Sequence, residues 1–217
     1  MNERTQDRLF AACGIASVVL ELGAVAIGAA GGRTMVSISS TPAQVAHALA
    51  MPAGTGVWVG AYIEMLSVGF FLAFAVWASA KLGGGLLGAV ARAAGTSYAT
   101  LTVASLGVLN AVEFRAGHGM GVQLATALTK VNEAIYVGTW FLAGFFLLAA
   151  GALALTSGRR ALGRGAIGIA AITLVGTAVS IDNLGQNAVF LWLVWIVWAS
   201  ISLARGERAR TPAVAVA

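Results

Sequence analysis

The sequence is poor in charge, cysteine and histidine. Asp, Glu, Lys and Arg make up 10% of its 217 residues, whereas soluble domains contain roughly 25%. So few charges exclude an ordinary soluble domain. The single cysteine, Cys13, excludes an internal disulfide and a CxxC redox motif, and the two histidines supply neither an HExxH motif nor a haem-binding pair. We therefore expect no metal site and no cofactor.

Hydrophobic residues make up 59% of the chain. A hydrocarbon core about 30 Å thick needs roughly 20 apolar residues in a helix, and the alternation of a β-barrel is absent. The first long apolar run exceeds a signal-peptide core and contains Glu21, so we expect a retained span. The sequence predicts one all-α domain over residues 1–217, an integral membrane bundle of six transmembrane helices at Leu9–Gly31, Val57–Ala80, Leu86–Val112, Val131–Thr156, Gly165–Ile181 and Ala188–Ala204.

The basic residues are distributed unevenly between the two ends of these segments. Three, namely Arg33, Arg115 and Lys130, fall at one set of ends. The other ten fall at the alternate ends: Arg4, Arg8, Lys81, Arg92, Arg159, Arg160, Arg164, Arg205, Arg208 and Arg210. The positive-inside rule then predicts cytoplasmic termini, with short tails at 1–8 and 205–217, in a multi-pass protein of a prokaryotic plasma membrane. The basic tail RGERAR suits anionic lipid, and we expect no nucleic-acid partner.

The predicted outer loops contain two local patterns. In TPAQVAHALAMP, Thr41 and Gln44 fit a capping box and Pro42 takes the first helical position, which predicts a short helix on the membrane surface. The favoured interpretation gives His47 on that helix no functional role, and the alternative is a ligand or proton carrier. GHGMG in the second outer loop lacks the strand and helix of a phosphate-binding motif, and a flexible turn is favoured.

Small residues recur through the predicted helices. Examples are the pairs Gly23 and Gly28, and Gly165 and Gly168. Small side chains let neighbouring helix backbones approach closely, so we expect these glycines to lie at helix contacts.

Five acidic residues lie within or beside the predicted spans. Glu64 stands inside the apolar run GAYIEMLSVGFFLAFAVW and Glu21 lies near the middle of the first span. An ionised side chain at that depth costs about 2.5 kcal/mol or more, so both should face a polar interior, find a partner or be protonated. Glu113 is expected to end the third span, Glu133 to begin the fourth and Asp182 to end the fifth. These five are the candidate catalytic residues.

Polar and aromatic residues accompany these acids at helical spacing. Glu133, Tyr136 and Trp140 fall on one face, and Asn110 shares a face with Glu113. We expect Glu64, Glu133 and Asn187 to converge on one cavity open to the outer half of the membrane. Tyrosine and tryptophan also gather at membrane interfaces as anchors, which is the alternative. The candidate substrate-binding residues are Tyr62, Asn110, Tyr136, Trp140, Asn183, Asn187 and Trp195.

Carboxylates beside aromatic rings favour one kind of chemistry. A carboxylic acid held neutral by an apolar pocket can donate a proton, and aromatic faces can stabilise the resulting cation. This suits isomerisation or cyclisation of a lipid-like or isoprenoid small molecule that enters from the bilayer. In size, helix number and placement of acids the chain resembles the small multi-helix membrane-bound terpene cyclases. The resemblance implies an acid that protonates an alkene or epoxide, and it assigns no individual residue.

Two other classes of protein remain open on the sequence alone. Acids within a membrane also serve as proton-coupled binding sites, which would make the chain a small transporter or channel. A non-catalytic accessory or sensing subunit would need neither chemistry nor conduction. The sequence does not determine the oligomeric state.

Overall fold

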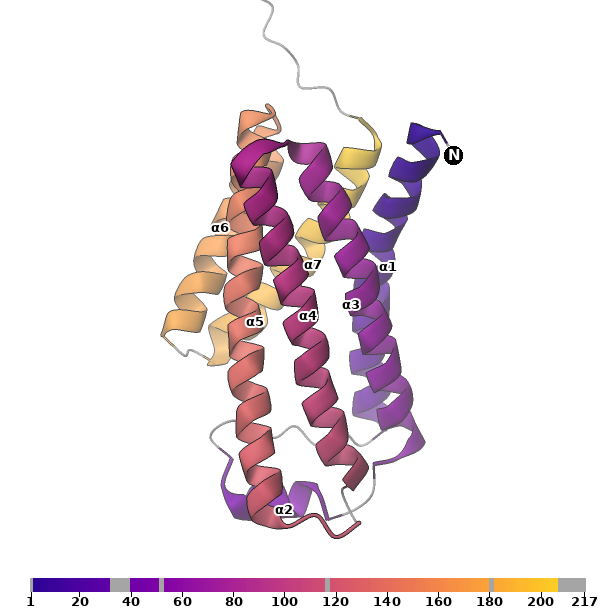
Figure 1. Cartoon of the computed structure of the whole chain (residues 1–217), viewed down its shortest axis with the longest axis vertical. Helices are drawn as coiled ribbons and strands as arrows, with labels where there is room; N and C mark the ends of the chain where they lie inside the picture. Colours follow the sequence, from indigo (N-terminus) through magenta and orange to yellow (C-terminus); the bar gives the residue numbers. More distant parts are fainter. Residues whose placement is uncertain (1, 32–39, 51–52, 116–117, 180–181, 207–217) are drawn as a thin grey trace, which may run out of the picture. The chain divides into compact units, whose positions relative to one another are not determined.

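The structure, a computed structural model, is α-helical throughout the residues that it describes. These are 2–31, 40–50, 53–115, 118–179 and 182–206, with the side chains of 182–187 excluded. Within them lie seven helices (Figure 1): α1 (Glu3–Ala30), α2 (Pro42–Ala48), α3 (Thr55–Leu82), α4 (Gly85–Arg115), α5 (Val122–Thr156), α6 (Arg160–Ala178) and α7 (Asp182–Ala204).

Four of these helices, α1, α3, α5 and α6, are long and apolar enough to cross a membrane, which indicates a membrane protein. The described apolar part of α7, Ala188–Ala204, is shorter. Helix α4 has ample length at 31 residues, but its middle contains the polar stretch from Thr96 to Ser105. Six spans with both termini cytoplasmic therefore remain a prediction.

Most helix boundaries differ from the predicted ones by a few residues, and two of the differences change where a predicted acid lies. Helix α5 begins at Val122 rather than Val131, so Glu133 lies about three turns inside it instead of at its start. The extra residues include Gln123 and Lys130, which are good helix formers but lower the hydropathy by which a span is recognised. Asp182 begins α7 and does not end the preceding helix. An acidic residue favours a helix N-terminus because of the helix dipole.

The chain divides into two compact units. The first unit contains 1–15, 73–96 and 141–217, and the second contains 16–72 and 97–140. By position in the sequence, the first unit includes ten of the 13 basic residues, while the second includes the other three. Glu21, Glu64, Glu113 and Glu133 all belong to the second unit, whereas Asp182 belongs to the first.

The core of the first unit is aromatic where α5 meets α7. The ring of Phe146 packs edge-on against Trp192 and Trp195, with centroids 5.8 and 6.1 Å apart. Trp195 is 1% exposed, and its indole N–H donates to the Leu162 carbonyl oxygen at 3.2 Å, which joins α7 to its neighbour α6 (Figure 1). The indole of Trp195, a predicted substrate-binding residue, is thus used inside this core.

A polar cluster joins the start of α1 to the end of α3 in the first unit. The Asp7 carboxylate accepts a hydrogen bond from Trp77 Nε1 at 3.0 Å and pairs with Lys81 Nζ at 2.9 Å. Glu3 also pairs with Lys81 at 2.9 Å, but its side chain is 81% exposed, against 18% for Asp7. Asp7 is therefore the member of this cluster that contributes most to stability.

We expect Asp7→Ala to lower the free energy of unfolding by about 1–2 kcal/mol, because the buried indole N–H of Trp77 loses its acceptor. Glu3→Ala, which removes an exposed ion pair with the same lysine, should cost less than about 0.5 kcal/mol. Reversible unfolding in mixed detergent micelles measures both. Equal costs for the two variants would contradict the importance of the Trp77 contact.

In the second unit the backbones of α1 and α3 approach each other closely at glycines. A Cβ added to Gly56 would lie 2.9 Å from the Cα of Gly31, and one on Gly60 would lie 3.0 Å from the Ala24 carbonyl oxygen and 3.1 Å from the Gly28 amide nitrogen. Since the neighbouring atoms belong to backbone, no rotamer change could make room. These positions require glycine.

The predicted glycine contacts are only partly confirmed. Nothing lies within 4 Å of a Cβ built on Gly23 or Gly168, so these two predictions are wrong. Gly28 does lie at the close approach of α1 and α3, and a Cβ on Gly165 would come 3.0 Å from the Trp198 ring. A glycine pattern alone does not show which face of a helix meets a neighbour.

The short helix α2 covers the ends of α4 and α5 within the second unit (Figure 1). Its predicted capping box is confirmed, since Thr41 Oγ1 accepts from the Gln44 amide at 3.3 Å and Gln44 Oε1 accepts from the Thr41 amide at 2.8 Å. Val45, 1% exposed, packs on Val112 of α4 and Ala125 of α5. This contact holds α2 in place.

Candidate functional site

Electrostatic interactions connect three glutamates and two tyrosines from α1, α3, α4 and α5 within the second unit, where Tyr136 is 42% exposed. Tyr98 of α4 interacts electrostatically with Glu21 of α1, Glu64 of α3 and Tyr136 of α5. Tyr136 interacts in turn with Glu21, Glu64 and Glu133. We call Glu21, Glu64, Glu133, Tyr98 and Tyr136 the acid–phenol cluster.

Glu21 is oriented by a hydrogen bond across the α1–α3 contact. The hydroxyl of Ser67, which is 4% exposed, donates to Glu21 Oε2 at 2.7 Å. This length is that of a strong hydrogen bond from a hydroxyl to a carboxylate. Glu21 thus has a hydrogen-bond partner, as expected from the sequence for an acid near the middle of a span.

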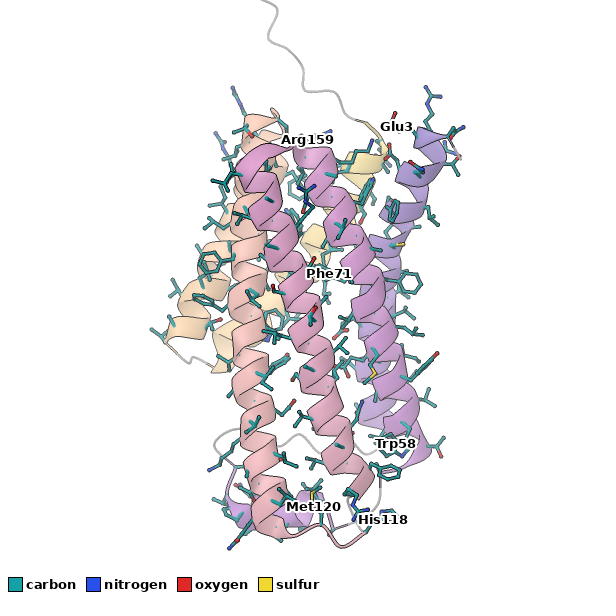
Figure 2. All side chains as sticks on the ribbon, viewed as in Figure 1. Glu3, Trp58, Phe71, His118, Met120 and Arg159 are labelled. Carbon is teal, nitrogen blue, oxygen red and sulfur yellow. The ribbon has the colours of Figure 1, made fainter. Side chains whose placement is uncertain are left out.

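Each phenol of the cluster also contacts another aromatic ring. Phe71 of α3 meets Tyr98 edge-on with ring centroids 5.0 Å apart, and Trp140 meets Tyr136 in the same manner at 5.8 Å. Figure 2 labels Phe71, which comes from the middle of α3. Aromatic faces stabilise nearby positive charge, so these rings are suitable neighbours for a cationic intermediate.

The interface between α4 and α5 in the second unit is polar as well. Ser105 Oγ donates to Asn132 Oδ1 at 2.7 Å, and both residues are buried. Thr102, Thr126 and Thr129 are buried too, but each hydroxyl donates to a carbonyl four residues earlier in its own helix. These threonines are satisfied within their helices, so the polar groups that can respond to a substrate are chiefly the carboxyls and phenols.

The remaining predicted acids have different surroundings. Glu113, expected near the water interface, is only 9% exposed at the end of α4, and Asn110 beside it is partly buried. The interactions that define the acid–phenol cluster include neither residue. The side chain of Asp182 lies outside the described residues, as do those of Asn183 and Asn187, so the predicted convergence on Asn187 falls there too.

Two further aromatic residues differ from the expected arrangement. Tyr62, a predicted substrate-binding residue, is 65% exposed and lies on the exterior of its unit. Tyr98 was not predicted, although it defines the cluster. The signal available was the sequence Tyr98, Thr102 and Ser105, which places three hydroxyls on one face of α4 at spacings of i, i+4 and i+7.

In the part of the chain that the structure describes, no group of three or more His, Cys, Asp or Glu residues is arranged to hold a metal ion. The comparisons with known proteins add no family, since no family model, curated protein or solved structure matches the chain. The chemistry of the site must therefore be inferred from the acid–phenol cluster itself.

Proposed function

We propose that the chain is an integral membrane enzyme that isomerises or cyclises a lipid-like or isoprenoid substrate by acid–base chemistry at the acid–phenol cluster. One observation carries the proposal: Glu21 and Glu64, from α1 and α3, lie within electrostatic range of Tyr98 and Tyr136, from α4 and α5. An ionised carboxyl is costly within a membrane span. Two titratable groups in different environments can divide the roles of acid and base between them.

We assign the two roles within this proposal. Glu64 is the proton donor, and Glu21, which accepts the hydrogen bond of Ser67, is the base that removes a proton at the end of the reaction. Phe71 and Trp140 flank the phenols and stabilise the cation formed between the two steps. Protons gained and lost balance, so isomerisation or cyclisation needs no cofactor.

The resemblance to membrane-bound terpene cyclases supports this choice of substrate class, through chain size, helix number and acids placed within the spans. The four acids of the second unit lie on four different helices, α1, α3, α4 and α5. That observation favours a second candidate, a proton-coupled small transporter, because acids from several helices commonly form intramembrane ion sites. An accessory or sensing subunit would need neither the acid–base chemistry nor the proton-coupled ion site.

Deuterium labelling distinguishes an enzyme from a transporter. Membranes containing the wild type or Glu64→Gln are incubated in D2O buffer, and their extracted lipids are compared by mass spectrometry. We expect a hydrophobic product that carries one solvent deuterium with the wild type and is missing with Glu64→Gln. Proton uptake that depends on Glu64 in proteoliposomes, without any deuterated product, would instead favour the transporter.

The enzyme proposal includes a topology with both termini cytoplasmic. In a Cys13→Ser background, a cysteine in place of Ser157 should react with a membrane-impermeant maleimide only after the cells are permeabilised. A cysteine in place of His118, which is exposed and precedes the start of α5, should react in intact cells. Labelling of the Ser157 position from outside would contradict the positive-inside assignment.

A further inference from the structure

A small cavity lies at the end of the second unit, beside the helix α2. It has a volume of about 230 Å³ and is lined by Ala46, Leu49, Arg115, Gly119, Met120, Val122 and Ala125. Figure 2 shows Met120 next to α2 and His118 close by, at the same end of the unit. The residues that line the cavity are separate from those of the acid–phenol cluster.

The side chains that line this cavity are apolar except for that of Arg115, while polar and apolar atoms contribute about equally to its surface. Leu49, Met120 and Val122 supply aliphatic and thioether surface, and Arg115 supplies a guanidinium. Arg115 is exposed, and among the described residues no carboxylate forms an ion pair with it. An unpaired guanidinium beside apolar surface matches a molecule that joins an anionic head to a hydrocarbon chain.

The position of the cavity favours a lipid of the bilayer as this molecule. Arg115 is the last residue of α4, and α2 lies across the ends of α4 and α5 with its buried Val45 toward Val112 and Ala125. The ends of long membrane-spanning helices lie at or beyond the level of the lipid headgroups. The cavity is smaller than the roughly 300–1,000 Å³ of sites for drug-sized ligands, so it accommodates a headgroup and the first carbons but not whole acyl chains.

We propose that this cavity binds the headgroup of an anionic phospholipid, with its phosphate on the Arg115 guanidinium and its glycerol and first methylenes against Leu49, Met120 and Val122. The lipid then fastens α2 to the ends of α4 and α5. The acyl chains remain in the bilayer, so the site takes its ligand directly from the membrane.

Thermal unfolding in detergent with added lipid tests this site. Phosphatidylglycerol should raise the Tm of the wild type by several degrees, and phosphatidylcholine should raise it much less. Arg115→Gln should bind phosphatidylglycerol about tenfold more weakly, as expected for loss of a charge-assisted hydrogen bond, and Arg115→Lys should retain part of the affinity. Lys130→Gln is the matched control, since it removes a positive charge from the same unit but not from the lining of the cavity.

A second variant separates the cavity from charge in general. Val122→Trp should fill the cavity and abolish the effect of phosphatidylglycerol while Arg115 remains. Equal responses to both lipids in the wild type, or equal responses in Arg115→Gln and Lys130→Gln, would overturn the proposal. Stabilisation by soluble decanoate but not by phosphatidylglycerol would also overturn it, because the ligand would then be a free amphiphile.

Discussion

Glu64→Gln should lower the rate of the proposed reaction by about 100-fold or more while the protein stays folded. Glutamine keeps the size and polarity of glutamate but cannot donate the proton, and removal of a general acid typically costs 100- to 10,000-fold in rate, about 2.7 kcal/mol or more. Glu64 is partly buried and interacts with both phenols of the cluster. The rate of formation of the deuterium-labelled product in purified membranes measures the loss.

Two further variants make this result specific. Tyr62→Phe is the matched control, because Tyr62 lies on the same helix two residues earlier but is exposed, and it should react at the wild-type rate. Glu113→Gln, outside the interactions that define the cluster, should lose much less activity than Glu64→Gln. Wild-type turnover by Glu64→Gln would remove the acid role, and loss of folded protein would favour a structural role for this carboxyl.

Gly60→Ile should prevent stable association of α1 and α3 within the second unit. The new Cβ would lie 3.0 Å from the Ala24 carbonyl oxygen and 3.1 Å from the Gly28 amide nitrogen. Overpacking costs about 1–3 kcal/mol when side chains can adjust, and here backbone must move, so we expect the upper end of that range or more. Unfolding in mixed micelles measures the loss.

Gly69→Ile on the same helix is the control. Nothing lies within 4 Å of a Cβ at Gly69, so this variant should unfold like the wild type or be slightly more stable, since isoleucine has a higher helix propensity than glycine. Comparable destabilisation by the two substitutions would show that the effect comes from the residue type and not from the helix contact.

The elements that local chemistry determines could be predicted from the sequence. Apolar runs located the long helices, and Thr41 with Gln44 located α2, because a capping box is complete within four residues. The start of α5 was missed because its first turns mix Gln123 and Lys130 with residues that are buried only by tertiary contacts. Their helical character depends on packing that hydropathy does not report.

The site was predictable only where burial itself is costly. Glu21 and Glu64 could be selected because an acid within a span demands an explanation. Tyrosine and tryptophan are equally at home in a core, at an interface or in a site, so Tyr98 was overlooked and Trp195 was placed in the site although its indole binds the Leu162 carbonyl. The direction in which such a ring points depends on how its helix is rotated about its own axis. The spacing of residues along one helix does not determine that rotation.

The hydrogen bond from Ser67 to Glu21 has a consequence for biogenesis. Ser67 is synthesised 46 residues after Glu21, and at about 5–20 residues per second this leaves an interval of roughly 2–9 s. During that interval α1 has no donor from α3 for its carboxyl. Arrival of α3 supplies the Ser67 hydroxyl, so Glu21 gains its hydrogen-bond partner during assembly of the helices rather than at insertion of α1.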